Sequence, residues 1–267
     1  MTRPMTLNKL LIPAFLLLAN ITKANNFATT VVSFSNLGVG VYGDPSAALG
    51  APAQFVKEPN GTIVGTSPGY PAWNRGLNDE PLVVTIRPGG HLTVRFDPPI
   101  RNLASNWYGY DFIVFGNSSL GATELFTAVT DLSSVFVSDG DWMEPTRVSV
   151  SPDGFQWYEY PLTVTTGADA LWPTLGNVWN AKSAEWNGPS NPTKPVSPQL
   201  NRAMIDGWSF ANLAEAYQGS AGGTAFDLSP SGFQSIRFVR FTGSGGEIDA
   251  VSRVGRQTSP AIPIQKH

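Results

Sequence analysis

Three acidic residues with apolar neighbours are the residues of this sequence most suited to chemistry. Asp111 lies between two aromatic residues, and Glu247 and Asp249 lie two residues apart in an apolar stretch. A carboxylate buried without a partner costs several kcal/mol, so each of these acids needs a hydrogen-bond donor, an arginine or a cation. Carboxylate oxygens are ligands that Ca²⁺ prefers. Asp111, Glu247 and Asp249 are therefore candidate calcium ligands.

The alternative partners for these acids are arginines. Arg95, Arg237 and Arg240 lie in stretches that alternate like β-strands, and any of them could neutralise a neighbouring carboxylate. The acids could also cap turns. The chain has no Asp-x-Asp-x-Asp-Gly loop, so a calcium site would have to combine residues from separate segments.

Four tryptophans form a second group of candidate binding residues. Trp172, Trp179 and Trp186 recur at seven-residue spacing in a stretch rich in Trp, Pro and Asn, and Trp107 begins another aromatic segment. A flat aromatic ring with a polar edge suits contact with both apolar and polar surfaces, and the apolar face of a sugar stacks on such a ring. These tryptophans are the predicted contacts to a polysaccharide or cell-surface glycan. The alternative is that they form the core of their own segment.

This chain lacks many of the residues that common enzyme mechanisms use. It has no cysteine and two histidines, His91 and His267, so nucleophilic triads and histidine-rich zinc sites lack their components. A glycosidase needs two carboxylates across a cleft, but no spacing selects a pair among the acids Asp111, Asp139, Asp141, Glu144, Glu185 and Glu247. No catalytic residue is predicted.

Composition and the N-terminus indicate an exported β-protein. Of 267 residues, 14% are charged, while 27 are Gly and 22 are Pro, which favours short strands and turns. The net charge of −3 argues against nucleic-acid binding. Residues 1–24 combine a basic start, the apolar run 10–19 and small residues before position 25, which predicts a signal peptide. No later stretch is apolar enough for a membrane helix, so a secreted, periplasmic or cell-surface protein is expected.

Alternating residues predict the strands. The segment 106–117 is expected to be a central strand, since bulky and branched side chains suit a pleated surface. Residues 81–86 and 91–96 are expected to form a hairpin around the turn Arg87-Pro-Gly-Gly90. A second hairpin is expected to join 147–151 to 155–160 through Pro152-Asp-Gly154.

One short helix is expected near 208–218. Apolar residues recur at helical spacing there, Ser209 is placed to cap the start and Gly219 to end it. Residues 168–204 show no periodicity and are predicted to be an irregular insertion. The predicted organisation is a single β-sandwich domain over 25–255 and a flexible tail over 256–267. Nothing in the sequence predicts the oligomeric state.

Several motifs, taken in order, resemble a group of bacterial exported cell-surface proteins, many of which carry a C-terminal PEP-CTERM sorting signal. The hairpin motif Ser151-Pro-Asp-Gly-Phe-Gln-Trp157 and the strand Arg237-Phe-Val-Arg-Phe241 are also similar to discoidin-type, galactose-binding-like jelly rolls. The motifs are Asp44-Pro-Ser-Ala-Ala-Leu-Gly-Ala-Pro52, Gly89-Gly-His-Leu-Thr-Val-Arg-Phe-Asp97, Tyr110-Asp-Phe-Ile-Val-Phe-Gly-Asn117, Val148-Ser-Val-Ser-Pro-Asp-Gly-Phe-Gln-Trp157, Gly222-Gly-Thr-Ala-Phe-Asp-Leu228 and Glu247-Ile-Asp-Ala-Val251.

The resemblance implies an antiparallel jelly roll that binds sugars through loops at one edge and holds a structural calcium. The last residues, from Gln257, lack the Pro-Glu-Pro motif of the sorting signal, so free secretion or a periplasmic location is expected rather than anchoring. The predicted function is a non-catalytic extracellular binding or adhesion module for glycans. The alternatives are a structural surface or matrix protein without a small ligand, and a polysaccharide hydrolase.

Overall fold

A computed structural model describes residues 25–127, 130–163, 166–180, 183 and 185–257. The predicted signal peptide and most of the predicted tail lie outside these residues. Within the described part, no helix has the length and apolar character needed to cross a membrane.

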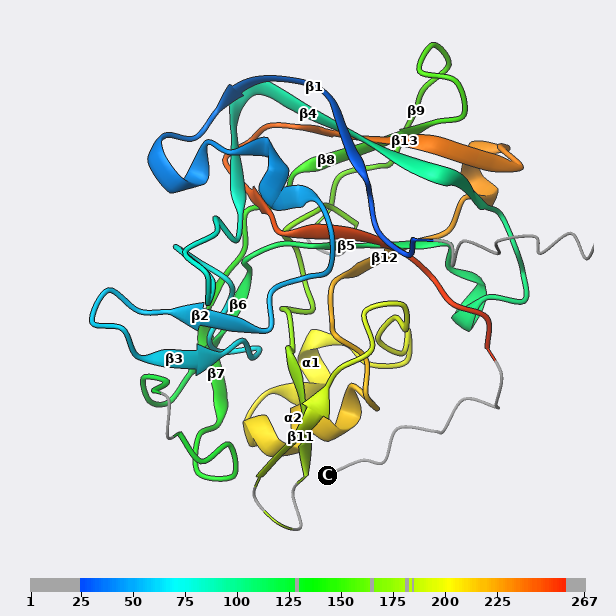
Figure 1. Cartoon of the computed structure of the whole chain (residues 1–267). Coiled ribbons are helices and arrows are strands. Elements are labelled where there is room, and N and C mark those ends of the chain that lie inside the picture. Colours follow the sequence, from blue (N-terminus) through cyan, green and yellow to red (C-terminus); the bar gives the residue numbers. More distant parts are fainter. Residues whose placement is uncertain (1–24, 128–129, 164–165, 181–182, 184, 258–267) are drawn as a thin grey trace, which may run out of the picture.

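The larger sheet forms the upper layer of the molecule in Figure 1. Its antiparallel strands follow the order β1-β4-β13-β8-β9, and β14 pairs with the start of β4. The strand bounds are β1 (Thr30–Leu37), β4 (Val84–Arg101), β13 (Ser235–Thr242), β8 (Arg147–Ser151), β9 (Tyr158–Glu159) and β14 (Glu247–Ile248).

A three-stranded antiparallel sheet lies beneath the larger one (Figure 1). Its order is β12 (Thr224–Phe226), β5 (Phe112–Phe115) and β15 (Ala250–Arg253). Phe112 and Val114 face the core between the sheets, and Ile113 and Phe115 face a separate, smaller apolar cluster on the other side. This alternation is the period of a strand that is covered on both faces. The predicted all-β, antiparallel sandwich is confirmed.

The first predicted hairpin is wrong. Residues 84–101 form one long strand, because Ile86 and His91 both pair with β1, opposite Leu37 and Ser35. Residues 87–90 lie opposite the single residue Asn36 of β1, and the register shifts across them. Gly89, at φ 77°, allows this bulge because it has no Cβ.

The predicted central strand is shorter than expected. Residues Trp107–Gly109 form a 3-10 turn, and β5 begins at Phe112. Tyr108 and Gly109 both have positive φ, which an extended strand does not allow. Within β5 all four residues are buried, and the strand is the middle one of its sheet.

The second hairpin and the helix agree with the sequence. β8 pairs with β9, and the carboxylate of Asp153 accepts hydrogen bonds from two backbone N–H groups in the turn between them. Helix α2 (Phe210–Ala216) is capped by Ser209, whose Oγ accepts from the N–H of Asn212 at 3.2 Å. Its predicted apolar face is buried.

A second apolar core lies among the elements drawn in the lower half of Figure 1. It joins α2 to residues of four other elements and to Leu171 and Leu175, so the segment predicted to be irregular contributes to a core. The elements around it are β6 (Ser119–Ala122), β7 (Val137–Trp142), β10 (Asn177–Asn180), β11 (Glu185–Pro189) and α1 (Arg202–Ile205). A small hairpin of β2 (Phe55–Lys57) and β3 (Ile63–Gly65) lies beside them.

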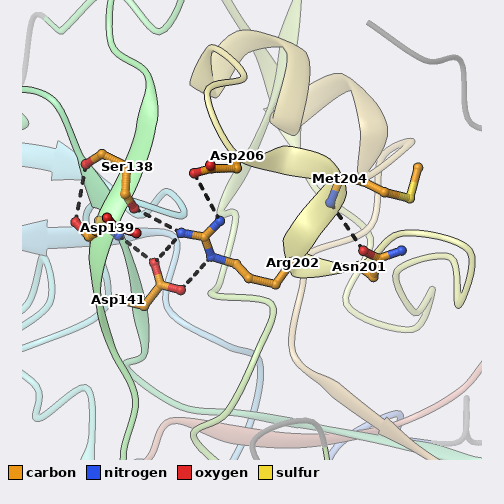
Figure 2. A network of polar contacts seen from close by, with 8 residues as sticks. Ser138, Asp139, Asp141, Asn201, Arg202, Met204 and Asp206 are labelled. Carbon is orange, nitrogen blue, oxygen red and sulfur yellow. Dashed lines mark hydrogen bonds and ion pairs between the residues drawn. The ribbon is translucent and has the colours of Figure 1, made fainter.

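Arg202 connects α1 to β7, as Figure 2 shows. Its Nε donates to Asp141 Oδ2 at 2.6 Å, and its Nη2 donates to Asp141 Oδ1 at 3.2 Å and to the Ser138 carbonyl at 3.0 Å. Asp141 also accepts from the N–H of Gly121 at 3.0 Å. These contacts fix the short helix against the β6–β7 hairpin.

Replacing Arg202 by Gln is expected to lower the free energy of unfolding by about 1–3 kcal/mol, because a largely buried, two-point, charge-assisted contact is lost. The matched control is Arg237→Gln, which removes the exposed pair with Asp97 and should cost less than about 1 kcal/mol. Urea unfolding measures both losses, and equal losses would contradict this role for Arg202.

Candidate functional site

Three carboxylates from distant segments converge at one end of the sandwich. One oxygen each of Glu144, Asp169 and Glu247 lies within 4.8 Å of the other two. Ca²⁺–oxygen distances are about 2.4 Å, so two ligands on opposite sides of one ion are about 4.8 Å apart. The spacing is therefore compatible with a shared cation, and we call these residues the carboxylate triad. The triad could hold a metal ion.

The triad is positioned where loops meet the ends of strands. Glu247 begins β14, and Glu144 lies between β7 and β8. Asp169 has φ 54°, a left-handed conformation that Asp adopts more readily than most residues. The carbonyl of Asp169 accepts from the N–H of Glu144 at 3.2 Å, and its Oδ2 accepts from the N–H of Glu247 at 3.1 Å. Backbone contacts thus tie all three residues together.

Neighbouring glycines let the chain come close to Asp169. A Cβ on Gly116 would lie 2.5 Å from Asp169 Oδ1, and a Cβ on Gly246 would lie 2.2 Å from the Glu144 carbonyl. Any other residue at either position would therefore displace the triad. Both positions require glycine for close approach.

Burial makes it costly for the triad to carry its full charge. Burial, and secondarily the nearby carboxylates, raises the pKa of Glu247 to about 8, and burial raises the pKa of Asp169 to about 7. Thr85 donates a hydrogen bond to Glu247 Oε1 at 2.7 Å, which only partly offsets this effect. No arginine or lysine forms an ion pair with the triad among the described residues. Protons or a cation must supply the missing positive charge.

The side-chain amide of Asn117 completes this arrangement. One of its terminal atoms lies 3.2 Å from both Asp169 Oδ2 and Glu247 Oε2. As the nitrogen, that atom donates to both carboxylates, and as the oxygen it would be a fourth ligand for a cation. Amide orientation follows from the hydrogen-bond network, so the two states of the site call for opposite orientations.

The buried carboxylate of Asp111 accepts hydrogen bonds from neutral donors rather than pairing with an arginine. It does not belong to the carboxylate triad. Its Oδ1 accepts from the N–H of Leu103 and from Asn106 Nδ2, and its Oδ2 accepts from the N–H of Leu228, each at 2.9 Å. Burial raises the pKa of Asp111, and these donors lower it in part. Asp111 therefore ties the segment 102–111 to the loop at Leu228, at one end of β5.

Asp249 lies at the opposite end of β5, where its N–H donates to the Phe115 carbonyl. Four residues of extended chain separate the two ends by about 13 Å, so Asp249 and Asp111 do not meet. The carboxylate of Asp249 accepts from the N–H of Ala53 at 2.9 Å and lines a separate cavity of about 520 Å³. Of the three predicted calcium ligands, the structure brings Glu247 alone into the triad.

The arginines considered as partners for these acids have other contacts. Arg237 pairs with Asp97, and the guanidinium of Arg240 lies 3.8 Å from the ring centre of Trp157 while its Nε donates to Thr93. Arg95 is exposed and forms no ion pair among the described residues. None of the three arginines therefore forms an ion pair with Asp111, Glu247 or Asp249 among the described residues.

The four predicted glycan-binding tryptophans occupy different environments. Trp179 is buried in the second core and packs edge-on against Trp186, 5.1 Å away across the β10–β11 pair. Trp107 is covered on one face by Lys194, whose Nζ lies 4.7 Å from the ring centre. Trp172 packs edge-on against Tyr217 and lines a groove. The tryptophans therefore do not form one surface.

The groove beside Trp172 has a volume of about 500 Å³, and we call it the aromatic groove. Trp172 is half-buried and has φ 78°, which is unusual for a bulky residue. The backbone is held there by a 2.7 Å hydrogen bond from the N–H of Gly223 to the Trp172 carbonyl. The groove is lined by aromatic and polar residues that include Tyr110, Tyr160, Trp172, Asn201, Thr224 and Asp227.

Comparison with known protein families, with curated proteins and with solved structures finds no match for this chain. The resemblance to exported surface proteins and to galactose-binding-like jelly rolls therefore stays a prediction.

Sequence reasoning missed Asp169 as a ligand and named Glu144 only among many acids. A local signal for Asp169 was present, because it is an acid inside the short apolar run Ala168-Asp-Ala-Leu-Trp172. That is the same signal that drew attention to Asp111. The carboxylate also lies three residues before Trp172, which joins the triad to the aromatic groove along the chain.

Proposed function

We propose that the protein is an exported, non-catalytic binding module that holds a glycan in the aromatic groove. The observation that carries this proposal is Trp172, a bulky side chain in a left-handed backbone conformation that lines a groove beside Tyr110 and Asp227. Such a conformation costs about 1–3 kcal/mol, and strain of this kind clusters at functional sites.

The chemistry of the groove supports a sugar as the ligand. Aromatic rings offer flat apolar surface, while the Asp227 carboxylate, the Asn201 amide and the Tyr110 hydroxyl offer hydrogen bonds. Ligand pockets of about 300–1,000 Å³ with mostly apolar walls and a few polar groups are typical of small-molecule sites. A sugar presents the same combination of an apolar face and hydroxyl groups.

The number of carboxylates in the groove supports binding rather than hydrolysis of a glycan. Among the described residues that line it, Asp227 is the one acid. Glycoside hydrolysis by the usual mechanism requires two carboxylates on either side of the bond that breaks. A structural surface protein without a small ligand is the remaining alternative, and it predicts no saturable glycan binding.

The proposal includes a structural calcium ion in the carboxylate triad. Three carboxylates and the Asn117 amide supply only oxygen, which suits a hard cation, and Ca²⁺ accepts the irregular geometry of ligands from separate loops. Binding there would fix Asp169, and through the short segment 169–172 it would steady Trp172 in its strained conformation.

A glycan array probed with the full chain tests the ligand class. We expect retention on oligosaccharides and loss of that retention in Trp172→Ala. The matched control is Trp142→Ala, which removes an indole that is 61% exposed on β7 and lies outside the groove. Because Trp172 also contacts Tyr217, Asp227→Asn serves as a second variant that leaves the packing intact. Equal retention of all four proteins would contradict the proposal.

A further inference from the structure

A second cavity, of about 470 Å³, lies between the end of β4 and the end of β15. It is lined by Arg101, Arg253 and Arg256, and we call it the arginine pocket. None of these arginines forms an ion pair with a carboxylate among the described residues. Three unpaired cations in one cavity are unexpected in a chain with a net charge of −3, because neighbouring like charges repel.

Arg253 is held in place but not satisfied. Its Nη2 donates to the Pro98 carbonyl at 2.9 Å, which fixes the guanidinium beside the pocket. Its Nε is buried and has no hydrogen-bond partner in the described part of the chain. A buried donor left without an acceptor is costly, so the guanidinium of Arg253 makes fewer hydrogen bonds than it can.

The acid that lines the pocket does not neutralise the arginines. Asp111 contributes to the wall, but its two oxygens accept from Leu103, Asn106 and Leu228. These neutral donors form hydrogen bonds with both oxygens of the Asp111 carboxylate. The positive charge of the pocket is therefore open to a ligand.

We propose that the arginine pocket binds an oxyanion, namely a carboxylate, sulfate or phosphate group of a ligand. The planar guanidinium offers paired N–H donors that match two oxygens of such a group. The cavity is larger than a single inorganic ion, so it accommodates a molecule that carries the anionic group. The site is distinct from the aromatic groove, since no residue lines both cavities.

Calorimetric titration of the full chain with sodium sulfate, sodium phosphate and sodium glucuronate, each against sodium chloride at equal ionic strength, tests the pocket. We expect saturable binding of at least one of these anions, and which anion binds identifies the source of the oxyanion. In the double variant Arg101→Gln/Arg256→Gln, the Kd should rise about tenfold or more. Both residues are exposed, so this variant should fold.

The matched control removes the same charge elsewhere. Arg87 and Arg95 are exposed and lie outside the pocket, so Arg87→Gln/Arg95→Gln should bind the anion as the wild type does, apart from a small general charge effect. Absence of saturable binding for all three anions would overturn the proposal. Equal weakening in the two double variants would also overturn it, because it would show a general effect of net charge.

Discussion

Calcium is expected to raise the unfolding midpoint of the protein by several degrees at pH 8.5 and by far less at pH 5.5. At a hundredfold excess over Kd, a ligand of the native state adds about 2.7 kcal/mol to the free energy of unfolding. For a chain of this size, each kcal/mol moves the midpoint by about 2–4 °C. Thermal unfolding with calcium and then with chelator measures the shift.

The direction of the pH effect follows from the triad. Burial raises the pKa of Asp169 to about 7 and that of Glu247 to about 8. At pH 5.5 both carboxyls therefore carry protons that calcium must displace, whereas at pH 8.5 both protons have largely left. The calcium-dependent gain in stability should increase through this range. A shift of equal size at the two pH values would contradict a site in the triad.

Variants separate the triad from the other buried acids. Asp169→Asn and Glu247→Gln should each lose the calcium shift, because each removes a charged ligand while keeping the shape of the side chain. Asp249→Asn is the matched control, since Asp249 is equally buried but lies outside the triad. If all three variants responded to calcium like the wild type, the ion would bind elsewhere.

The second large effect concerns Asp249 itself. Burial raises its pKa to about 8 in the folded chain, against an ordinary value of 3.8. Between pH 4 and pH 8 the folded state keeps this proton while the unfolded chain has released it, so folding loses stability as the pH rises through this range. Above about pH 8 the loss levels off. A shift of this size corresponds to a loss on the order of 5 kcal/mol.

Asp249→Asn should remove this loss, because the amide is neutral at every pH. We expect the stability of the variant relative to the wild type to increase by several kcal/mol between pH 4 and pH 9, measured by urea unfolding in chelator. Asp139→Asn replaces an exposed carboxylate and should show no comparable trend. If Asp249→Asn and Asp139→Asn showed the same pH dependence, Asp249 would be ionised in the folded protein.

The fold was predictable where the local pattern and the final environment agree. Alternation over 235–241 and the turn Pro152-Asp-Gly154 correspond to β13 and the β8–β9 hairpin. The segment around Gly89 was predicted as a hairpin turn because a glycine pair suits a turn and a bulge equally. Only the pairing with β1 distinguishes the two, and that pairing depends on residues far away in the sequence.

The sequence indicated which kinds of site to expect, but not which residues form each site. The need of Asp111 for a partner followed from its neighbours, but the N–H of Leu228 that satisfies it lies on a distant loop. Likewise, Glu247 was recognisable as a buried acid, whereas Glu144 and Asp169 join it only through long-range packing. Trp179 and Trp172 share a sequence environment, and tertiary structure alone buries Trp179 inside the second core and leaves Trp172 at the edge of the same core, beside a groove.

Isothermal titration of the strongest array glycan into the full-length protein tests the central claim most directly. We expect saturable binding of one glycan per chain and a Kd that is about tenfold higher or more in Trp172→Ala, since stacking on an aromatic ring and its buried area are lost together. Trp142→Ala should bind like the wild type. Absence of saturable binding, or an unchanged Kd in Trp172→Ala, would contradict a glycan site in the aromatic groove.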